Sequence, residues 1–122
     1  MAAADQALTD LTEISSQIEA AALFDVNGAV TASTLGDPEP FVRAVQDLVA
    51  AAGEAAGSVS QIEAATPHGS VFVVREGDAF IAATTHSEPT VALVFYDLKT
   101  ALRAAGPEAK SRRRTKKKDD GS

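Results

Sequence analysis

The chain has 122 residues, of which 45% are hydrophobic and 23% are charged, a composition typical of one globular domain. It contains no cysteine, which excludes disulfide bonds and thiolate metal sites. The net charge of −6 is unevenly distributed along the chain. Residues 110–122 hold seven cations and two acids, a net +5, so the residues before them carry −11.

The apolar runs are far shorter than the roughly 20 residues that a membrane span needs. The first ten residues include two aspartates and lack the basic start and apolar stretch of a signal peptide. We therefore expect a cytoplasmic protein that does not span a membrane.

Residues 5–20 are predicted to form the first helix. Leu8, Leu11 and Ile18 recur at helical spacing, and acidic and amide side chains occupy the other side. This pattern is typical of an amphipathic helix that packs on the body of a domain.

Two apolar runs, residues 21–26 and 29–34, are predicted to pair as a β-hairpin. They flank Asn27-Gly28, a dipeptide that tolerates the positive φ angles of a type I′ turn. The segment beginning at Asp25 also resembles the start of a calcium loop. Position twelve of such a loop must be a bidentate glutamate, however, and here it is Gly36. We therefore interpret the segment as a turn and expect no metal.

Residues 40–56 are predicted to form a helix with more apolar surface than one sheet requires. Asp37 is expected to cap it, Pro38 and Pro40 suit its first turn, and Gly57 suits the left-handed position after it. One line of apolar residues at helical spacing, expected to pack on the body of the domain, is Phe41, Val45, Leu48, Ala52 and Ala55. A second line flanks the first: Val42, Val49 and Ala56. We expect this helix to cover a sheet and also to form a subunit interface, with Val42, Val45 and Val49 near a two-fold axis.

Three further strands are predicted at residues 59–66, 71–74 and 79–85. Short turns at Pro67-His68-Gly69 and Gly77-Asp78 join them, which favours an antiparallel meander. Residues 71–74 are all β-branched or aromatic, which is typical of a strand with both faces buried.

The last helix is expected to be capped by Ser87, to hold Pro89 in its first turn and to end at Gly106-Pro107. Its apolar stripe is Val91, Val94, Phe95, Leu98, Ala101 and Leu102. The complete order is one helix, two strands, one helix, three strands and one helix. This order predicts an α/β protein of the α+β type, with a single five-stranded antiparallel sheet and helices on its faces.

Few side chains in the sequence are suited to catalysis. His68 and His86 fall in predicted turns, where a lone histidine is usually solvated, and no zinc constellation of standard spacing is present. The sequence lacks a P-loop, a nucleophile elbow and a dinucleotide-binding fingerprint, and its aromatic residues do not gather with basic ones. We therefore predict a binding or regulatory module and not an enzyme, without cofactor or metal and without specific nucleic-acid binding.

Several local patterns follow one another in a recognisable order. Leu8-x-x-Leu11 precedes the run Ala22-Leu23-Phe24-Asp25-Val26-Asn27-Gly28-Ala29-Val30-Thr31-Ala32-Ser33, in which an apolar strand, an Asp-x-Asn-Gly turn and a strand ending in Ala-Ser succeed one another. The alanine-rich second helix comes next, then Ile62-Glu63-Ala64, and then Val71-Phe72-Val73-Val74 with Arg75-Glu76-Gly77-Asp78. Across residues 6–105 this combination resembles the Roadblock family, the dynein light-chain-type domains also found in bacteria and archaea. The expected fold is accordingly Roadblock/profilin-like.

The resemblance implies a homodimer, or a heterodimer with a related Roadblock protein. In the family the second helices pack across a two-fold axis and the third strands pair into one continuous sheet. The interface residues that this implies here are Phe41, Val42, Val45, Leu48, Val49, Ala52, Val59 and Ile62.

The resemblance also implies a signalling and scaffold function, because such dimers are platforms for Ras-like small GTPases and in some cases stimulate GTP hydrolysis. The family contributes no nucleotide site and usually no catalytic residue. Polar residues on the rim of the second helix, Arg43, Gln46 and Asp47, are the candidate GTPase contacts. A small-ligand sensor and a purely structural dimerisation or tethering subunit are the alternatives.

The C-terminal segment lies outside the family pattern. Residues 1–107 are expected to form the domain, and residues 108–122 are expected to be a disordered basic tail, because Ala109 is their one apolar residue. Its cations are Lys110, Arg112, Arg113, Arg114, Lys116, Lys117 and Lys118. An acidic protein surface, an anionic membrane surface and nucleic acid compete as its partner, and a solubilising role is the alternative to all three.

Overall fold

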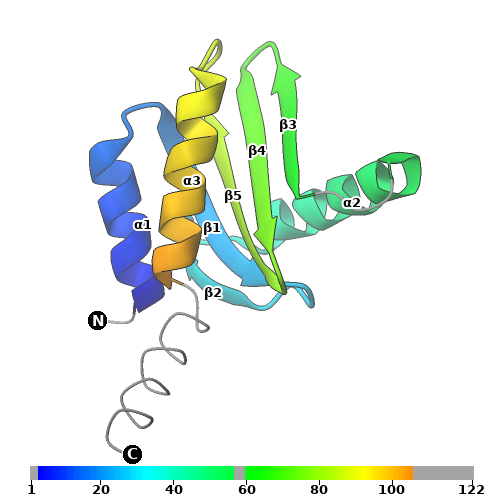
Figure 1. Cartoon of the computed structure of the whole chain (residues 1–122), viewed down its shortest axis with the longest axis horizontal. Coiled ribbons are helices and arrows are strands. Elements are labelled where there is room, and N and C mark those ends of the chain that lie inside the picture. Colours follow the sequence, from blue (N-terminus) through cyan, green and yellow to red (C-terminus); the bar gives the residue numbers. More distant parts are fainter. Residues whose placement is uncertain (1–2, 57–59, 106–122) are drawn as a thin grey trace, which may run out of the picture.

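The computed structural model describes residues 3–56 and 60–105. The elements are α1 (Ala3–Ile14), β1 (Ile18–Asp25), β2 (Val30–Ser33), α2 (Glu39–Ala56), β3 (Gln61–Thr66), β4 (Gly69–Glu76), β5 (Ala79–Thr85) and α3 (Val91–Ala105). The strands form one sheet in the order β2-β1-β5-β4-β3, in which every neighbouring pair is antiparallel (Figure 1). The predicted element order and fold class are therefore confirmed.

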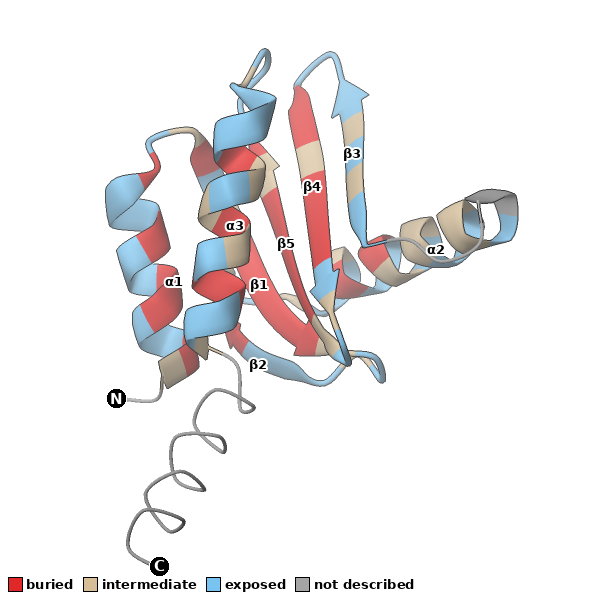
Figure 2. Ribbon diagram, viewed as in Figure 1, coloured by how far each residue is buried: buried red, intermediate tan, exposed pale blue. Residues whose placement is uncertain are grey.

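The sheet separates two hydrophobic cores. Helices α1 and α3 cover one face, and α2 crosses the other face (Figure 1). Successive strand residues point to opposite faces, so Leu23 joins the first core and Phe24 the second, and Phe72 and Val73 divide in the same way. The strands covered from both sides therefore need apolar residues at consecutive positions, which accounts for the run Val71–Val74 (Figure 2).

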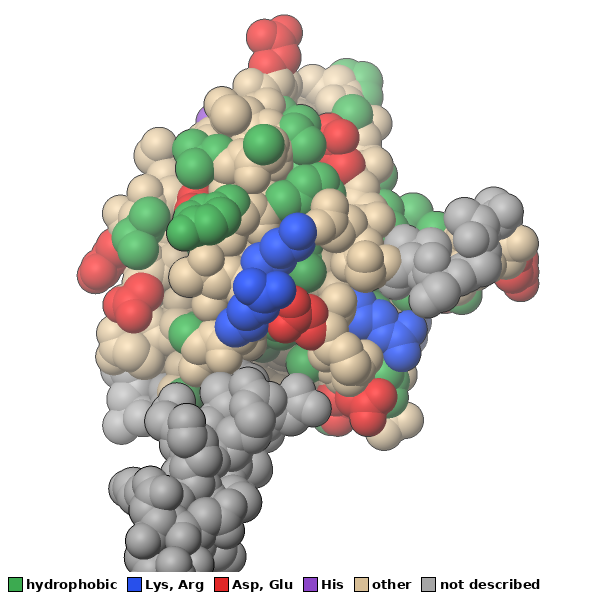
Figure 3. All heavy atoms as spheres, in the orientation of Figure 1, with side chains coloured by type: hydrophobic (Ala, Val, Ile, Leu, Met, Phe, Trp, Pro, Cys, Tyr) green, Lys and Arg blue, Asp and Glu red, His purple; other side chains and the backbone are tan. Residues whose placement is uncertain are grey.

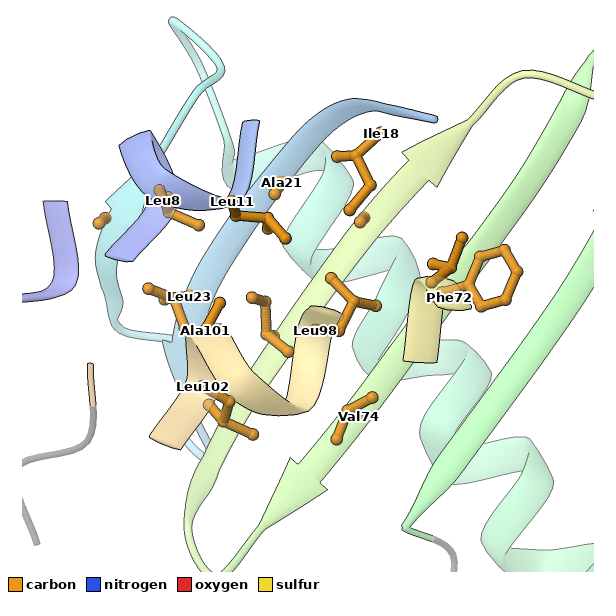
Figure 4. Packing of buried hydrophobic residues seen from close by; sticks show 14 of the residues in the cluster. Leu8, Leu11, Ile18, Ala21, Leu23, Phe72, Val74, Leu98, Ala101 and Leu102 are labelled. Carbon is orange, nitrogen blue, oxygen red and sulfur yellow. The ribbon is translucent and has the colours of Figure 1, made fainter. Parts of the chain in front are cut away.

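In the first core, leucines of α1 and α3 pack on apolar residues of β1, β4 and β5 (Figure 4). Leu8 and Leu11 of α1 and Leu98 of α3 are at most 3% exposed. The Phe95 ring lies edge-on to that of Phe72, with centroids 5.0 Å apart, which fixes α3 against β4.

The first helix ends earlier than its periodicity predicts. It stops at Ile14, and Ile18 belongs to β1, where it pairs with Thr85. Ile18 is buried in either arrangement, so its spacing from Leu11 does not distinguish a helix from a strand. Ile14, by contrast, is 75% exposed, which shows that the apolar stripe of the helix stops there.

The hairpin turn is not of type I′. Gly28 has a φ of 85°, whereas Asn27 is not among the described non-glycine residues with positive φ. The carboxylate of Asp25 holds the turn, because its Oδ1 accepts hydrogen bonds from the backbone N of Asn27 at 2.9 Å and of Ala29 at 3.0 Å. The turn therefore needs one left-handed residue instead of two, and Gly28 supplies it.

Two helix starts also differ from expectation. The Val42 N–H donates to the Pro38 carbonyl at 2.9 Å, which places Pro38 and not Asp37 at the cap position of α2. Helix α3 begins at Val91, and the Gln17 side-chain oxygen accepts a hydrogen bond from the Thr90 N–H at 2.6 Å. A residue distant in sequence thus binds the start of α3, in place of the predicted Ser87 cap.

The predicted strand ends are close to those observed. β5 has the predicted bounds, and β4 extends beyond the apolar run on both sides. The predicted helix stop at Gly57, the interface residue Val59 and the predicted stop at Gly106-Pro107 lie outside the described residues.

Candidate interaction surface

Helix α2 packs on the sheet through two valines. Val42 and Val45 are each 2% exposed and lie in the second core with Phe24, Val73 and Phe80. Because both side chains are already buried within one chain, they have no free surface to offer a partner. Both valines belong to the core of the single chain, and their place near a two-fold axis stays a prediction.

The other predicted interface residues of the described chain keep part of their surface. All five are half-buried, and all except Ala52 pack against the second core: Phe41, Leu48, Val49, Ala52 and Ile62. The C-terminal half of α2 extends past β3 at the edge of the sheet (Figure 1). The start of this half packs on the sheet through Leu48 and Val49, whereas the later turns have no strand beneath them (Figure 1).

The sheet face under α2 is only partly covered. A row of cross-strand neighbours, called here the open row, consists of Ala64, Val71, Thr84 and Ala20. All four are half-buried. By strand alternation they point to the same side as Val73 and Ala82, which α2 does cover.

The dimensions explain why the open row exists. An eight-residue strand such as β4 is about 26 Å long, and a helix is about 10 Å across. One helix that crosses the strands therefore leaves part of their length bare. The small side chains of the open row would let another helix approach the sheet closely.

The candidate GTPase contacts divide into two groups. Arg43 and Asp47 are exposed on the outer side of α2, and the Arg43 guanidinium lies 3.3 Å from the Glu39 carboxylate. Gln46 is half-buried and packs on the hairpin turn, since a Cβ at Gly28 would lie 2.8 Å from its Nε2. Gln46 thus helps to hold α2 on the hairpin, whereas Arg43, paired with Glu39 in solvent, and Asp47 are exposed to a partner.

Sequence reasoning did not select Arg75. Its guanidinium carbon lies 5.3 Å from the centroid of the Phe80 ring, and its Nε donates to the Gly77 carbonyl at 2.9 Å. Arg75 is two residues after Val73, so strand alternation places it on the α2 side of the sheet. The two-residue spacing from Val73 is visible in the sequence and could have identified Arg75 as a second exposed cation on the α2 face.

No chemical site accompanies this surface in the described residues. His68 and His86 are exposed, and His86 Nδ1 lies 2.8 Å from the Ser87 carbonyl oxygen. Residues 3–56 and 60–105 contain no group of three or more histidine or acidic side chains placed to hold a metal ion. Within the same ranges, no helix combines the length and the apolar character that crossing a membrane requires.

On the sheet face opposite to α2, one ion pair joins α3 to β4. Arg103 of α3 donates to the Glu76 carboxylate through Nε at 2.9 Å and through an Nη at 2.6 Å. These hydrogen bonds, and then the negative charge of Glu76, raise the pKa of the Arg103 guanidinium above its ordinary value. Since arginine is already fully charged at physiological pH, the raised pKa does not change the charge of Arg103 there.

Comparison with known proteins identifies the architecture. No family model and no curated protein matches the sequence. Among solved structures, a Roadblock/LC7 domain from Streptomyces avermitilis matches with a TM-score of 0.68 at 18% identity, over 81% of this chain and 94% of that one. The fold is that of Roadblock/LC7 domains.

Two other solved structures support the same assignment. The gliding protein MglB from Thermus thermophilus matches with a TM-score of 0.69 at 17% identity, over 82% of this chain and 83% of its own. LokiProfilin2, solved in complex with rabbit actin, matches with a TM-score of 0.58 at 10% identity, over 80% of this chain and 91% of the other. The Roadblock/profilin-like architecture expected from the sequence is thus confirmed at the level of the fold.

Proposed function

We propose that this protein is a dimeric, non-enzymatic regulatory partner of a Ras-like small GTPase. The observation that carries the proposal is the half-covered sheet face beside α2, on a Roadblock fold. The half-buried apolar residues of α2 lie beside this face. A second helix packed there would bury both the open row and these residues.

The occupant of this face is a second copy of α2, or of its equivalent in a related Roadblock protein. Helix α2 has 18 residues, so it is about 27 Å long, which is sufficient to cross the open row of four strands. In an isologous dimer each chain both offers the open row and inserts its α2. Phe41, Leu48 and Ala52 then contact the partner, while Val42 and Val45 remain in the subunit core.

The dimer is tested by placing a charge on the open row. Ala64→Glu introduces an unpaired carboxylate into the proposed contact, which strongly disfavours burial. The matched control is Ala65→Glu, the same change on the next residue of β3, which is exposed and points to the other face. By sedimentation at tens of micromolar we expect dimers for the natural protein and for Ala65→Glu, and monomers for Ala64→Glu.

A monomeric natural protein under these conditions would contradict the dimer. If Ala64→Glu forms dimers as stable as those of the natural protein, the dimer interface does not include the open row. Circular dichroism of both variants distinguishes loss of dimerisation from loss of folding.

Dimerisation would bring the outer sides of two α2 helices onto one surface. Each contributes Arg43 and Asp47, so a GTPase would meet charges of both signs from two chains. Because the described residues contain no nucleotide motif, regulation would act through differential binding of the GTPase's own switch loops in one nucleotide state. An arginine supplied in trans can assist GTP hydrolysis, and Arg43 is the candidate on the α2 helix.

The GTPase contact is tested with Ras-like GTPases of the same cell, each loaded with GDP or with a non-hydrolysable GTP analogue. We expect affinity for one GTPase to differ between the two states by at least tenfold. Arg43→Ala should weaken that binding by about two- to fivefold, because an exposed charge contact contributes at most about 1 kcal/mol. Lys99→Ala, which removes a cation from α3, is the control and should change little.

The alternatives correspond to different outcomes. Equal affinity for both nucleotide states would leave a structural scaffold, and binding to no GTPase would overturn the proposal. A sensor that binds a metabolite inside its core has less support, because the cavity that Ala4, Leu23 and Leu102 line in the first core has a volume of about 30 Å³. Ligand pockets are roughly tenfold larger.

A further inference from the structure

A groove lies between α1 and α3, on the sheet face opposite to α2. Its volume is about 340 Å³. Small residues of the two helices line it, among them the buried Ala7 and Ala101 and the exposed Ala104. Where two helices pack through alanines, no long side chain fills the space above the contact, and the groove results.

The groove combines exposed apolar surface with negative charge. Ile14 is 75% exposed and Tyr96 is 68% exposed, although both are large apolar side chains on packed helices. Asp10 and Asp97 are its two charged lining residues. Figure 3 shows this side of the molecule, where apolar side chains lie over the helices with acidic ones near them.

The cations of α3 do not neutralise these carboxylates. Arg103 is engaged by Glu76 of β4, and among the described residues no lysine or arginine, Lys99 included, forms a salt bridge with Asp10 or Asp97. Asp10 accepts a hydrogen bond from the uncharged Gln6 amide at 2.9 Å. The groove is therefore suited to a segment that is cationic and carries flat or long side chains able to cover a tyrosine ring.

We propose that the chain's own basic tail occupies this groove, with arginines 112–114 over Tyr96 and between Asp10 and Asp97. Guanidinium groups stack on tyrosine rings and pair with carboxylates, and their aliphatic stems cover apolar surface. The tail supplies all of these features in one short segment, and it is net +5 against an acidic body.

The position of the tail favours the same occupant. Helix α3 ends at Ala105, one residue after the groove residue Ala104. Tyr96 lies nine residues back along the helix, about 14 Å away. Arg112 is seven residues past Ala105 and can reach up to about 24 Å, so it can return along α3 as far as Tyr96. The covalent connection holds the tail near the groove at an effective concentration of the order of millimolar.

The groove contains its own reporter. Tyr96 is the single tyrosine of the chain, and there is no tryptophan, so all tyrosine fluorescence comes from this site. Collisional quenching by acrylamide, which is uncharged, measures how much of the ring is accessible. The natural protein is compared with a chain truncated after Glu108, in low salt and in 1 M salt.

In low salt we expect quenching of Tyr96 to be about twofold weaker in the full chain than in the truncated chain. In 1 M salt the Debye length is about 3 Å, so the two chains should then be quenched equally. The double variant Asp10→Asn, Asp97→Asn of the full chain should behave like the truncated chain. A control with the same loss of charge outside the groove, Asp37→Asn, Asp78→Asn, should retain the protection.

Equal quenching of full and truncated chains in low salt would overturn the proposal, as would protection that persists in 1 M salt. Loss of protection in the control double variant would show a response to net charge and not to this groove. Protection that disappears on dilution would assign the tail to the groove of another copy and not to its own.

Discussion

Gly69 begins β4 at the point where this strand passes closest to the end of β5. A Cβ on Gly69 would overlap the carbonyl oxygen of Thr85, and the residue has a φ of 157°. The turn before it is held by Thr66, whose Oγ1 donates to the Gly69 carbonyl at 2.8 Å and accepts from the Gly69 N–H at 3.2 Å. The backbone here is therefore fixed on both sides and cannot move away from a side chain.

Gly69→Ala should destabilise the protein by about 2 kcal/mol or more, because the added methyl meets backbone and not a flexible side chain. Gly36→Ala is the control, since nothing lies within 4 Å of a Cβ at Gly36 and its φ is not positive. The control should be neutral or slightly stabilising through the reduced entropy of the unfolded chain. Urea denaturation of both variants measures the difference, and equal stabilities would show that the strand can shift at Gly69.

At the scale of single elements, the periodicity of apolar residues predicts the type of each helix and strand. It does not predict which of those apolar residues are buried against the sheet and which remain at the surface. Val42 and Val49 were assigned to one line of α2, yet Val42 is buried against the sheet and Val49 keeps part of its surface. The difference arises because α2 extends past the edge of the sheet, so burial falls along the helix as well as around it. Periodicity alone carries no information on where a supporting sheet ends.

The ends of elements depended on contacts that are distant in sequence. The side chain of Gln17 meets the start of α3, and Asp25, the last residue of β1, shapes the hairpin turn with its side chain. Likewise the open row joins four strands through cross-strand pairing, which the order of elements does not determine. The fold class could therefore be predicted from the sequence. The candidate interaction surface could not, because the residues of the open row become neighbours only through the register of the strands.

At the scale of the whole molecule, the two faces of the sheet have different uses in our proposals. The α2 face is apolar and half-covered, which suits a second copy of the chain. The face of α1 and α3 is closed by helices and has an acidic groove, which suits a basic segment. The two surfaces lie on opposite sides of the sheet, so the tail can leave or enter its groove without opening the dimer.

Removal of the tail tests whether residues 1–107 are the complete folding unit, as the sequence predicts. The buried residues of both cores lie between Ala4 and Leu102, so a chain truncated after Glu108 loses none of them. In 0.5 M salt, where charge contacts of the tail are screened, we expect the same thermal midpoint for the full and truncated chains within about 1 °C. The sedimentation behaviour should also be unchanged, because the open row and α2 are intact. A midpoint lowered by several degrees in high salt would correspond to a loss of about 1 kcal/mol, and it would mean that the last residues contribute to packing as well as charge.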